Sequence, residues 1–238
     1  MSVPLLRIEG LSAGYHSRDV LKAISLQASE GELISVIGPN GHGKSTLMRT
    51  ISGLVAVRSG SIRLGEREIA GLAPHKIVEA GIVHVPQGDL LFPEMTVREN
   101  LLMGAYLREA ASHSGERLET VYNLLPKLRD RSNQIASTLS GGERRMCGIG
   151  RGLMSGGRVL MLDEPSLGLA PIVIDQIYEL IGTLKASGRT IILVEENASR
   201  IMDMADRIYL LDNGSFVWSG GGGDLMTSPE ILTTYLGV

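Results

Sequence analysis

A glycine-rich stretch in the first quarter of the chain has the residue types and spacing of a phosphate-binding loop. It follows the apolar run Leu33–Ile37, precedes apolar residues at helical spacing, and reads Gly38-Pro39-Asn40-Gly41-His42-Gly43-Lys44-Ser45-Thr46. Glycines permit the tight turn and let backbone N–H groups approach an anion, and the following helix N-terminus adds partial positive charge. At the spacing G-x-x-x-x-G-K-S, the lysine reaches the β- and γ-phosphates of a nucleotide and the serine hydroxyl binds Mg²⁺. The expected phosphate ligands are Gly38, Asn40, Gly41, Gly43, Lys44, Ser45 and Thr46.

Two adjacent carboxylates, Asp163 and Glu164, follow a later apolar run at residues 159–162. In α/β sheets, ligands bind beyond the carboxyl ends of the strands, where these acids are expected. Asp163 is then placed to hold Mg²⁺, and Glu164 to activate an attacking water as general base. An apolar strand that ends in two solvated acids would look the same. The phosphate-binding loop upstream favours the catalytic interpretation.

Short β-branched runs alternate with helical patterns along most of the chain. Such runs cover residues 33–37, 82–85, 159–162, 191–194 and 208–211. Most are apolar on both faces, as strands covered by helices on each side would be. A helical stripe at i, i+4, i+7 and i+11 is formed by Val173, Ile177, Leu180 and Leu184. The alternation predicts an α/β fold with a mainly parallel core sheet.

Residues 89–157 break this alternation, because they contain helical patterns and no convincing strand. Leu118, Val121, Leu125 and Leu128 form one apolar stripe there. We expect a single domain over residues 1–238, with a nucleotide-binding core at 1–88 and 158–238 and an inserted helical subdomain at 89–157. Antiparallel strands are expected at residues 5–9, 24–29 and 61–64. The glycines at 220–223 are expected to form a flexible link before a final helix.

Composition argues against several other classes of protein. The net charge is −3 and only 4% of the residues are aromatic, so neither a basic field nor a base-stacking surface for nucleic acid is expected. Cys147, the lone cysteine, is expected to pack as a small apolar side chain in a helix. We expect no signal peptide at the N-terminus, and no run approaches the ~20 apolar residues of a spanning helix. Any membrane role must therefore come through a partner.

A further stretch combines a helix start with two glycines: Leu139-Ser140-Gly141-Gly142-Glu143-Arg144-Arg145. Ser140 and Glu143 have the S-x-x-E spacing of a capping box, and the glycines would let an anion approach the helix N-terminus. The stretch resembles the signature L-S-G-G-[EQ] of the ABC ATPases, and the resemblance covers essentially the whole chain. In that family the signature of one subunit completes the nucleotide site of another. The resemblance therefore implies a head-to-tail dimer enclosing two ATP molecules, with Ser140, Gly141 and Gly142 facing the partner's ATP.

The same resemblance implies roles for three more parts of the chain. Tyr15 matches the aromatic residue that stacks on adenine, a contact worth about 1–3 kcal/mol per base, although an ordinary surface tyrosine would look the same. Gln87 matches the glutamine that contacts Mg²⁺ and water and links the core to the helical subdomain. Residues 165–169 match the loop that crosses the dimer interface. The implied catalytic residues are Glu164, Lys44 and Gln87, and the implied Mg²⁺ ligands are Ser45, Gln87 and Asp163.

Three features depart from the pattern of the family. Glu196 stands where the family usually places a histidine that contacts the γ-phosphate, and a carboxylate there is repulsive unless it is protonated, turned away or paired. His42 replaces a small residue of the phosphate loop, and it is expected to point to solvent, with an added polar contact as the alternative. Gly148, Gly150 and Gly152 lie in the helix after the signature, where each glycine costs roughly 0.5–1 kcal/mol, so a loose helix and slow catalysis are expected.

The resemblance is strongest to one branch of the family. Residues 91–101, 164–171, 194–198 and 235–238 look like the second ATP-binding subunit of bacterial branched-chain amino acid uptake systems. The subunit of urea and short-chain amide uptake is the alternative. Such systems imply a homodimer or a heterodimer with a second ATPase subunit, two membrane permeases and a periplasmic or extracellular solute-binding protein. The implied location is the cytoplasmic face of the inner membrane.

Two other classes of protein remain as alternatives. A soluble ABC ATPase that acts on DNA would carry a long coiled coil between the phosphate loop and the signature, and the chain lacks sustained heptads there. An ABC ATPase that acts on the ribosome would carry two cassettes, and this chain has one. The signature argues against a switch GTPase. The favoured interpretation is that the chain is an ATPase that drives transport.

Overall fold

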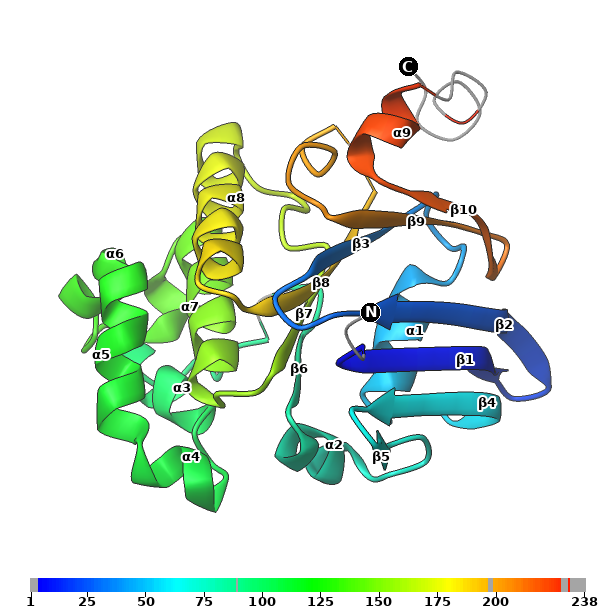
Figure 1. Ribbon diagram of the computed structural model, residues 1–238. Helices are drawn as coiled ribbons and strands as arrows, with labels where there is room; N and C mark the ends of the chain where they lie inside the picture. The colour runs from blue at the N-terminus through cyan, green and yellow to red at the C-terminus, as the bar shows by residue number, and fades with distance from the viewer. Residues whose placement is uncertain (1–3, 89, 197–198, 228–230, 232–238) are drawn as a thin grey trace.

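The computed structural model describes residues 4–88, 90–196, 199–227 and 231. Within these ranges the strands form two sheets, with helices between and around them (Figure 1). The larger sheet has the order β10-β9-β3-β8-β7-β6. Its strands are β3 (Leu33–Ile37), β6 (Ile82–Val85), β7 (Val159–Asp163), β8 (Thr190–Glu195), β9 (Arg207–Asp212) and β10 (Ser215–Gly220). All pairs are parallel except β9–β10, which is antiparallel. The predicted mainly parallel α/β sheet is therefore confirmed.

The larger sheet separates two apolar cores. Leu33 and Ile37 pack into one core, and Ile34 and Val36 pack into the other, because successive side chains of a strand point to opposite faces. Helices α7 (Gly141–Met154) and α8 (Pro171–Ala186) contribute to the first core. Helices α1 (Lys44–Ile51) and α2 (Pro74–Ala80) contribute to the second, together with the smaller sheet (Figure 1).

The smaller sheet is antiparallel and has the order β2-β1-β4-β5. Its strands are β1 (Leu6–Tyr15), β2 (Arg18–Ala28), β4 (Val57–Leu64) and β5 (Arg67–Glu68). They are longer than the sequence pattern predicts. The pairing of β1 shifts register after Ile8 and again after Leu11, and such bulges change the phase of the alternation. For this reason the apolar pattern of β1 appears to stop at Glu9, although the strand continues.

The chain between β6 and β7 is helical. The elements are α3 (Val97–Met103), α4 (Arg108–Ser112), α5 (Ser114–Leu124), α6 (Pro126–Asp130), a 3₁₀ turn at Ala136–Thr138, and α7. The four leucine and valine residues of the predicted stripe are all buried. They do not lie on one helix, because Leu125 leaves the helical conformation (φ −131°, ψ 68°) and Pro126 begins α6.

The glycines of α7 allow close packing. The helix is continuous from Gly141 to Met154. A Cβ at Gly150 would lie 2.9 Å from Leu101 Cδ2, and one at Gly152 would lie 2.7 Å from Val85 Cγ2. These glycines therefore bring α7 against α3 and against β6. Cys147, on the same helix, is buried in the apolar core as expected.

The glycine run near the C-terminus is part of the regular structure, so the flexible link predicted there is wrong. Gly220 ends β10, and α9 (Gly222–Met226) begins two residues later. A Cβ at Gly222 would lie only 1.7 Å from the carbonyl oxygen of Met202. The glycine is needed for a close backbone approach. The final helix expected after this run falls largely on residues outside the described ranges.

His84, on β6, is a polar residue in a largely apolar environment. Ser52 Oγ donates its single proton to the carbonyl oxygen of Met48 (2.8 Å). His84 Nδ1 lies 3.0 Å from Ser52 Oγ and must therefore be the protonated ring nitrogen that donates to it. Nε2 is then a buried acceptor, and no residue within the described ranges donates a hydrogen bond to it. Burial, with a smaller effect of Arg49, lowers the pKa of His84 to about 4.

We expect His84 to destabilise the fold in acid. Because its pKa in the folded state lies below the ordinary value of about 6.5, only the unfolded chain takes up this proton between pH 6.5 and about 4, and stability falls as pH falls. The loss between pH 7.5 and pH 5 should be about 2 kcal/mol. Urea unfolding across this range should show a smaller loss for His84→Gln. Equal slopes for the wild type and His84→Gln would contradict this assignment.

Candidate active site

The predicted catalytic residues come from the carboxyl ends of neighbouring strands. The phosphate loop follows β3, Gln87 follows β6, and Asp163 and Glu164 end β7. Because β3, β8, β7 and β6 are consecutive and parallel, these ends meet at one edge of the sheet. Hydrogen bonds and an ion pair connect the residues there.

The phosphate loop has a backbone that requires glycine at both of its ends. Gly38 has φ 149°, and a Cβ there would lie 2.1 Å from the carbonyl oxygen of Leu211. Gly43 has φ 112° and is the N-cap of α1, with its carbonyl oxygen accepting from the amide of Leu47 at 2.9 Å. The loop therefore leads directly into a helix N-terminus with free N–H groups, which is an anion-binding arrangement.

Lys44 is buried inside this loop, with only 3% of its surface exposed. Its Nζ donates to the carbonyl oxygens of Gly38 (2.8 Å) and Pro39 (3.2 Å) and to Asn40 Oδ1 (3.3 Å). Nζ also lies 3.4 Å from Glu164 Oε1. A buried ammonium needs such partners, and they hold it where the sequence predicts phosphate groups to bind.

Ser45 and Asp163 form a hydrogen-bonded pair of oxygen-bearing side chains beside Lys44. Ser45 Oγ donates to Asp163 Oδ1 at 3.2 Å. Burial raises the pKa of Asp163, the nearby Glu164 raises it further, and the hydrogen bond from Ser45 opposes the shift. Hydroxyl and carboxylate oxygens are the ligands that Mg²⁺ prefers in proteins. The pair therefore fits the metal that the sequence predicts.

Glu164 connects the two sides of the site. Its Oε2 accepts from Gln87 Nε2 at 3.0 Å, while Oε1 faces Lys44. Its backbone is left-handed (φ 46°), which costs a non-glycine residue on the order of 1–3 kcal/mol. Its amide donates to the carbonyl oxygen of Val194 at 2.9 Å. Polar contacts thus join Lys44, Glu164 and Gln87, and the pair formed by their chain neighbours Ser45 and Asp163 lies beside them.

His42 turns toward the protein, so the expectation that it points to solvent is wrong. Its Nδ1 lies 2.7 Å from Asp212 Oδ1 at the end of β9, and the side chain is 27% exposed. The amide of Gly214 also donates to the carbonyl oxygen of His42 at 3.1 Å. His42 therefore ties the phosphate loop to the turn between β9 and β10.

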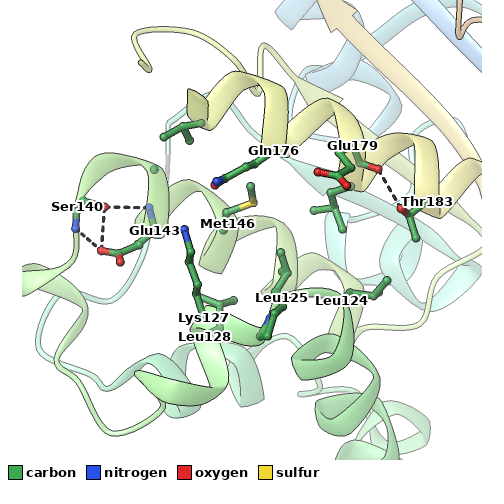
Figure 2. Close-up of a pocket in the computed structure, with 14 residues that line it drawn as sticks. Leu124, Leu125, Lys127, Leu128, Ser140, Glu143, Met146, Gln176, Glu179 and Thr183 are labelled. Atoms are coloured by element: carbon green, nitrogen blue, oxygen red, sulfur yellow. Dashed lines mark hydrogen bonds between the residues drawn. The ribbon is translucent and has the colours of Figure 1, made fainter. Parts of the chain in front are cut away.

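The signature stretch begins α7, as predicted. Ser140 Oγ accepts from the amide of Glu143 at 3.4 Å, and Glu143 Oε2 accepts from the amide of Ser140 at 2.9 Å and from its hydroxyl at 2.8 Å (Figure 2). This is the capping box expected from the sequence. Arg131 Nε lies 2.7 Å from Glu143 Oε1 and fixes the carboxylate further.

Gly142 has a packing role besides the one predicted for it. A Cβ at this position would lie 2.7 Å from Val173 Cγ1, so α7 packs closely against α8 here. Beyond this contact a cavity of about 450 Å³ separates α8 from α7 and from the α5–α6 region. Leu125, Leu128 and Met146 line it from the helical region, and Gln176 points into it from α8 (Figure 2).

Within one chain, the signature and the phosphate loop belong to opposite sides of the large sheet. The helix α1 packs into one apolar core and α7 into the other. Ser140, Gly141 and Gly142 are therefore not brought to the Lys44–Glu164 network. The contacts of Ser140 described above are within its own capping box.

Comparisons with known proteins agree with this geometry. A profile of the ABC transporter family matches residues 21–167. The chain belongs to the ABC transporter family. It is 42% identical to the high-affinity branched-chain amino acid transport ATP-binding protein BraG of Pseudomonas aeruginosa, over 98% of this chain and all of that one. It is 36% identical to the probable branched-chain amino acid transport ATP-binding protein LivF of Archaeoglobus fulgidus, over 98% of this chain and 99% of that one.

Among solved structures, the chain is similar to the ADP conformation of an ATP-binding cassette of an ABC transporter. The TM-score is 0.85 and the identity 27%, over 98% of each chain. As a member of this family the chain binds and hydrolyses ATP.

The structure separates the two consecutive glutamates after Val194. Glu196, at the place of the family's usual histidine, is exposed. Glu195 is only 4% exposed and accepts from the amide of Ser166 at 3.4 Å, and burial raises its pKa. Glu195 was not among the residues predicted from the sequence. The signal was the alternation of β8, since Ile191 and Leu193 of the same face are core residues.

Tyr15 lies at the end of β1 with 41% of its surface exposed. It lines a hollow that Arg49 and Leu54 also line. Its stacking on adenine stays a prediction, as do the individual contacts of the phosphate loop with ATP. Asn197 and Ala198, part of the sequence resemblance, lie outside the described residues.

We expect Glu164→Gln to reduce hydrolysis at least ~100-fold, because loss of a general base typically costs 10²–10⁴. ATP affinity should stay within a few fold, since a glutamine preserves the size and hydrogen bonding of the side chain. Steady-state phosphate release and equilibrium binding of a fluorescent ATP analogue measure the two effects. Glu68→Gln, which alters an exposed carboxylate in the smaller sheet, is the control. Turnover at the wild-type rate in Glu164→Gln would show that Glu164 is not the base.

Proposed function

We propose that this chain is the ATP-hydrolysing subunit of an importer of branched-chain amino acids. The cargo assignment rests on the similarity of the chain, along nearly its whole length, to the BraG and LivF proteins, which are named for this transport. The network around Glu164 supplies the chemistry that would drive transport. The ATPase itself has no need to contact the amino acid, because partner subunits would carry it.

The network suggests a division of roles in hydrolysis. The phosphate loop amides and Lys44 would hold the triphosphate and stabilise the charge that develops on it. Ser45 and Asp163, with Gln87, would hold Mg²⁺, which supplies further neutralisation of that charge. Glu164 would orient a water molecule and take its proton. The hydrogen bond from Gln87 fixes the rotamer of Glu164 before the nucleotide arrives.

The working unit would be a dimer. The signature helix N-terminus lies away from the phosphate loop of its own chain, so a second ATPase subunit would have to supply it. Either a second copy or a related ATPase subunit could do so. In that arrangement Ser140, Gly141 and Gly142 would approach the partner's nucleotide with free helical N–H groups, which attract anions.

Ser140→Arg should block hydrolysis and leave the ATP affinity of the isolated monomer unchanged, because the bulky side chain obstructs only the partner's site. In the Glu164→Gln background, ATP should produce a dimer in size-exclusion chromatography, and Ser140→Arg should abolish it. Ser137→Arg, an exposed serine three residues earlier, is the control and should form the dimer. Reduced nucleotide affinity in the Ser140→Arg monomer would contradict the cross-subunit arrangement.

A surface near Gln87 fits a membrane partner. No helix among the described residues is long and apolar enough to span a bilayer. Exposed apolar side chains gather around a hollow of about 400 Å³ between β6, α3 and α7. They are Leu90, Phe92, Met103 and Tyr106. A gathered patch of this kind is typical of an interaction site, and an amphipathic cytoplasmic helix of a permease would cover it. The ATPase would then sit peripherally on the cytoplasmic face of the membrane.

The proposed cargo is tested by purifying the complete transporter through a tag on this chain. We expect two permeases to co-purify, and the solute-binding protein of the system to retain leucine, isoleucine or valine. Its leucine-loaded form should stimulate ATP hydrolysis by the complex several-fold. Retention of urea or acetamide instead would favour the alternative solute class. Salt-sensitive co-purification of nucleic acid without permeases would indicate an ABC ATPase outside transport.

A further inference from the structure

The loop that follows Glu164 begins with backbone strain and so needs fixed points on both sides. It connects β7 to α8, and the left-handed Glu164 is its first residue. A conformation of this kind persists only where the surroundings determine it. The upstream fixed point is the bond from the Glu164 amide to Val194 at the end of β8. The loop's own bonds, such as the Leu167 amide to the Glu164 carbonyl at 3.3 Å, join only residues of the loop itself.

Glu195 provides the downstream fixed point. In the pairing of β7 with β8, Asp163 lies opposite Val194, so the next residue of β8 lies beside the loop. The carboxylate of Glu195 accepts from the Ser166 amide at 3.4 Å. The hydroxyls of Ser166 and of Tyr178 on α8 face this carboxylate, and both oppose the rise that burial causes in its pKa. This buried side chain thus lies where a strand, the loop and a helix meet.

We propose that Glu195 is a positioning residue for ATP hydrolysis. By holding Ser166, it keeps the backbone of Glu164 left-handed and directs the carboxylate of Glu164 toward Gln87 and Lys44. Glu195 itself does not touch the reacting atoms. The inference rests on the proposed role of Glu164 as the general base.

The arrangement is too specific for a residue that only fills the core. A buried carboxylate is costly, and an apolar side chain would pack at this position without that cost. The carboxylate oxygens of Glu195 face the segment that follows Glu164, the proposed base. Tyr178 is held in turn by Arg200, whose guanidinium lies 5.9 Å from the centre of its ring. The carboxylate therefore has a fixed position from which to hold the loop.

The test measures kinetics and hydrogen exchange on the full-length protein. Glu195→Ala should lower kcat on the order of 10–100-fold, as misplacement of a catalytic group does, and should change KM for ATP less than twofold. Amide exchange in peptides that cover residues 164–169 should accelerate, while other core peptides stay protected. Glu195→Gln keeps an acceptor for the Ser166 amide and should restore most of both properties. Tyr178→Phe should have a smaller effect that adds nothing to Glu195→Ala, because Tyr178 acts through Glu195.

Thr190→Val is the matched control. Thr190 is a buried polar residue at the opposite end of β8, where its Oγ1 accepts from the amide of Gly31 at 2.8 Å. The variant should lose stability and keep kcat.

If amide exchange in residues 164–169 of Glu195→Ala is unchanged, Glu195 does not hold the loop. If the exchange is faster but kcat stays at the wild-type value, Glu195 is not a positioning residue for hydrolysis. Wild-type turnover in Glu164→Gln would instead remove the base assignment, and the exchange data would still decide whether Glu195 holds the loop.

Discussion

The burial of one positive charge, the ammonium of Lys44, organises the site. It is enclosed by carbonyl oxygens of its own loop and by the carboxylate of Glu164. For this contact to form, the end of β3 must lie near the end of β7, and the intervening strand β8 must supply a bond to the Glu164 backbone. The strand order of the large sheet is therefore a direct requirement of the chemistry.

The same sheet keeps the phosphate loop and the signature of one chain apart. Alternate side chains of the strands pack into two cores, one containing α1 and the other containing α7 and α8. The phosphate loop leads into α1, and the signature forms the N-terminus of α7. Since both helix N-termini attract anions, a nucleotide bound between them requires two chains. In the proposed dimer, the packing of the helices is the reason that a partner would be needed.

Features that depend on local pattern were predictable, and features that depend on contacts distant in sequence were not. The core strands and the phosphate loop could be predicted because their composition and spacing are local. The length of β1 was hidden by a register shift after Ile8, and the glycine run at 220–223 serves a backbone approach to Met202. His42 was misassigned because its partner, Asp212, lies 170 residues away. Glu195 was missed because only the pairing of β7 with β8 places it beside the loop.

The segment after Gln87 connects the Glu164 site with helix α7 and with the apolar patch. Gln87 is bonded to Glu164 in the site. The next residues are held by α7, because Arg145 donates to the carbonyl oxygen of Gly88 and Arg151 donates to that of Leu90 at 2.9 Å. The guanidinium of Arg151 also lies 5.6 Å from the centre of the Phe92 ring, in the apolar patch. A displacement of α7 must therefore move both the patch and the backbone next to Gln87. Since α7 begins with the signature, closure on a partner's nucleotide and movement of a permease helix would be transmitted through the same few bonds.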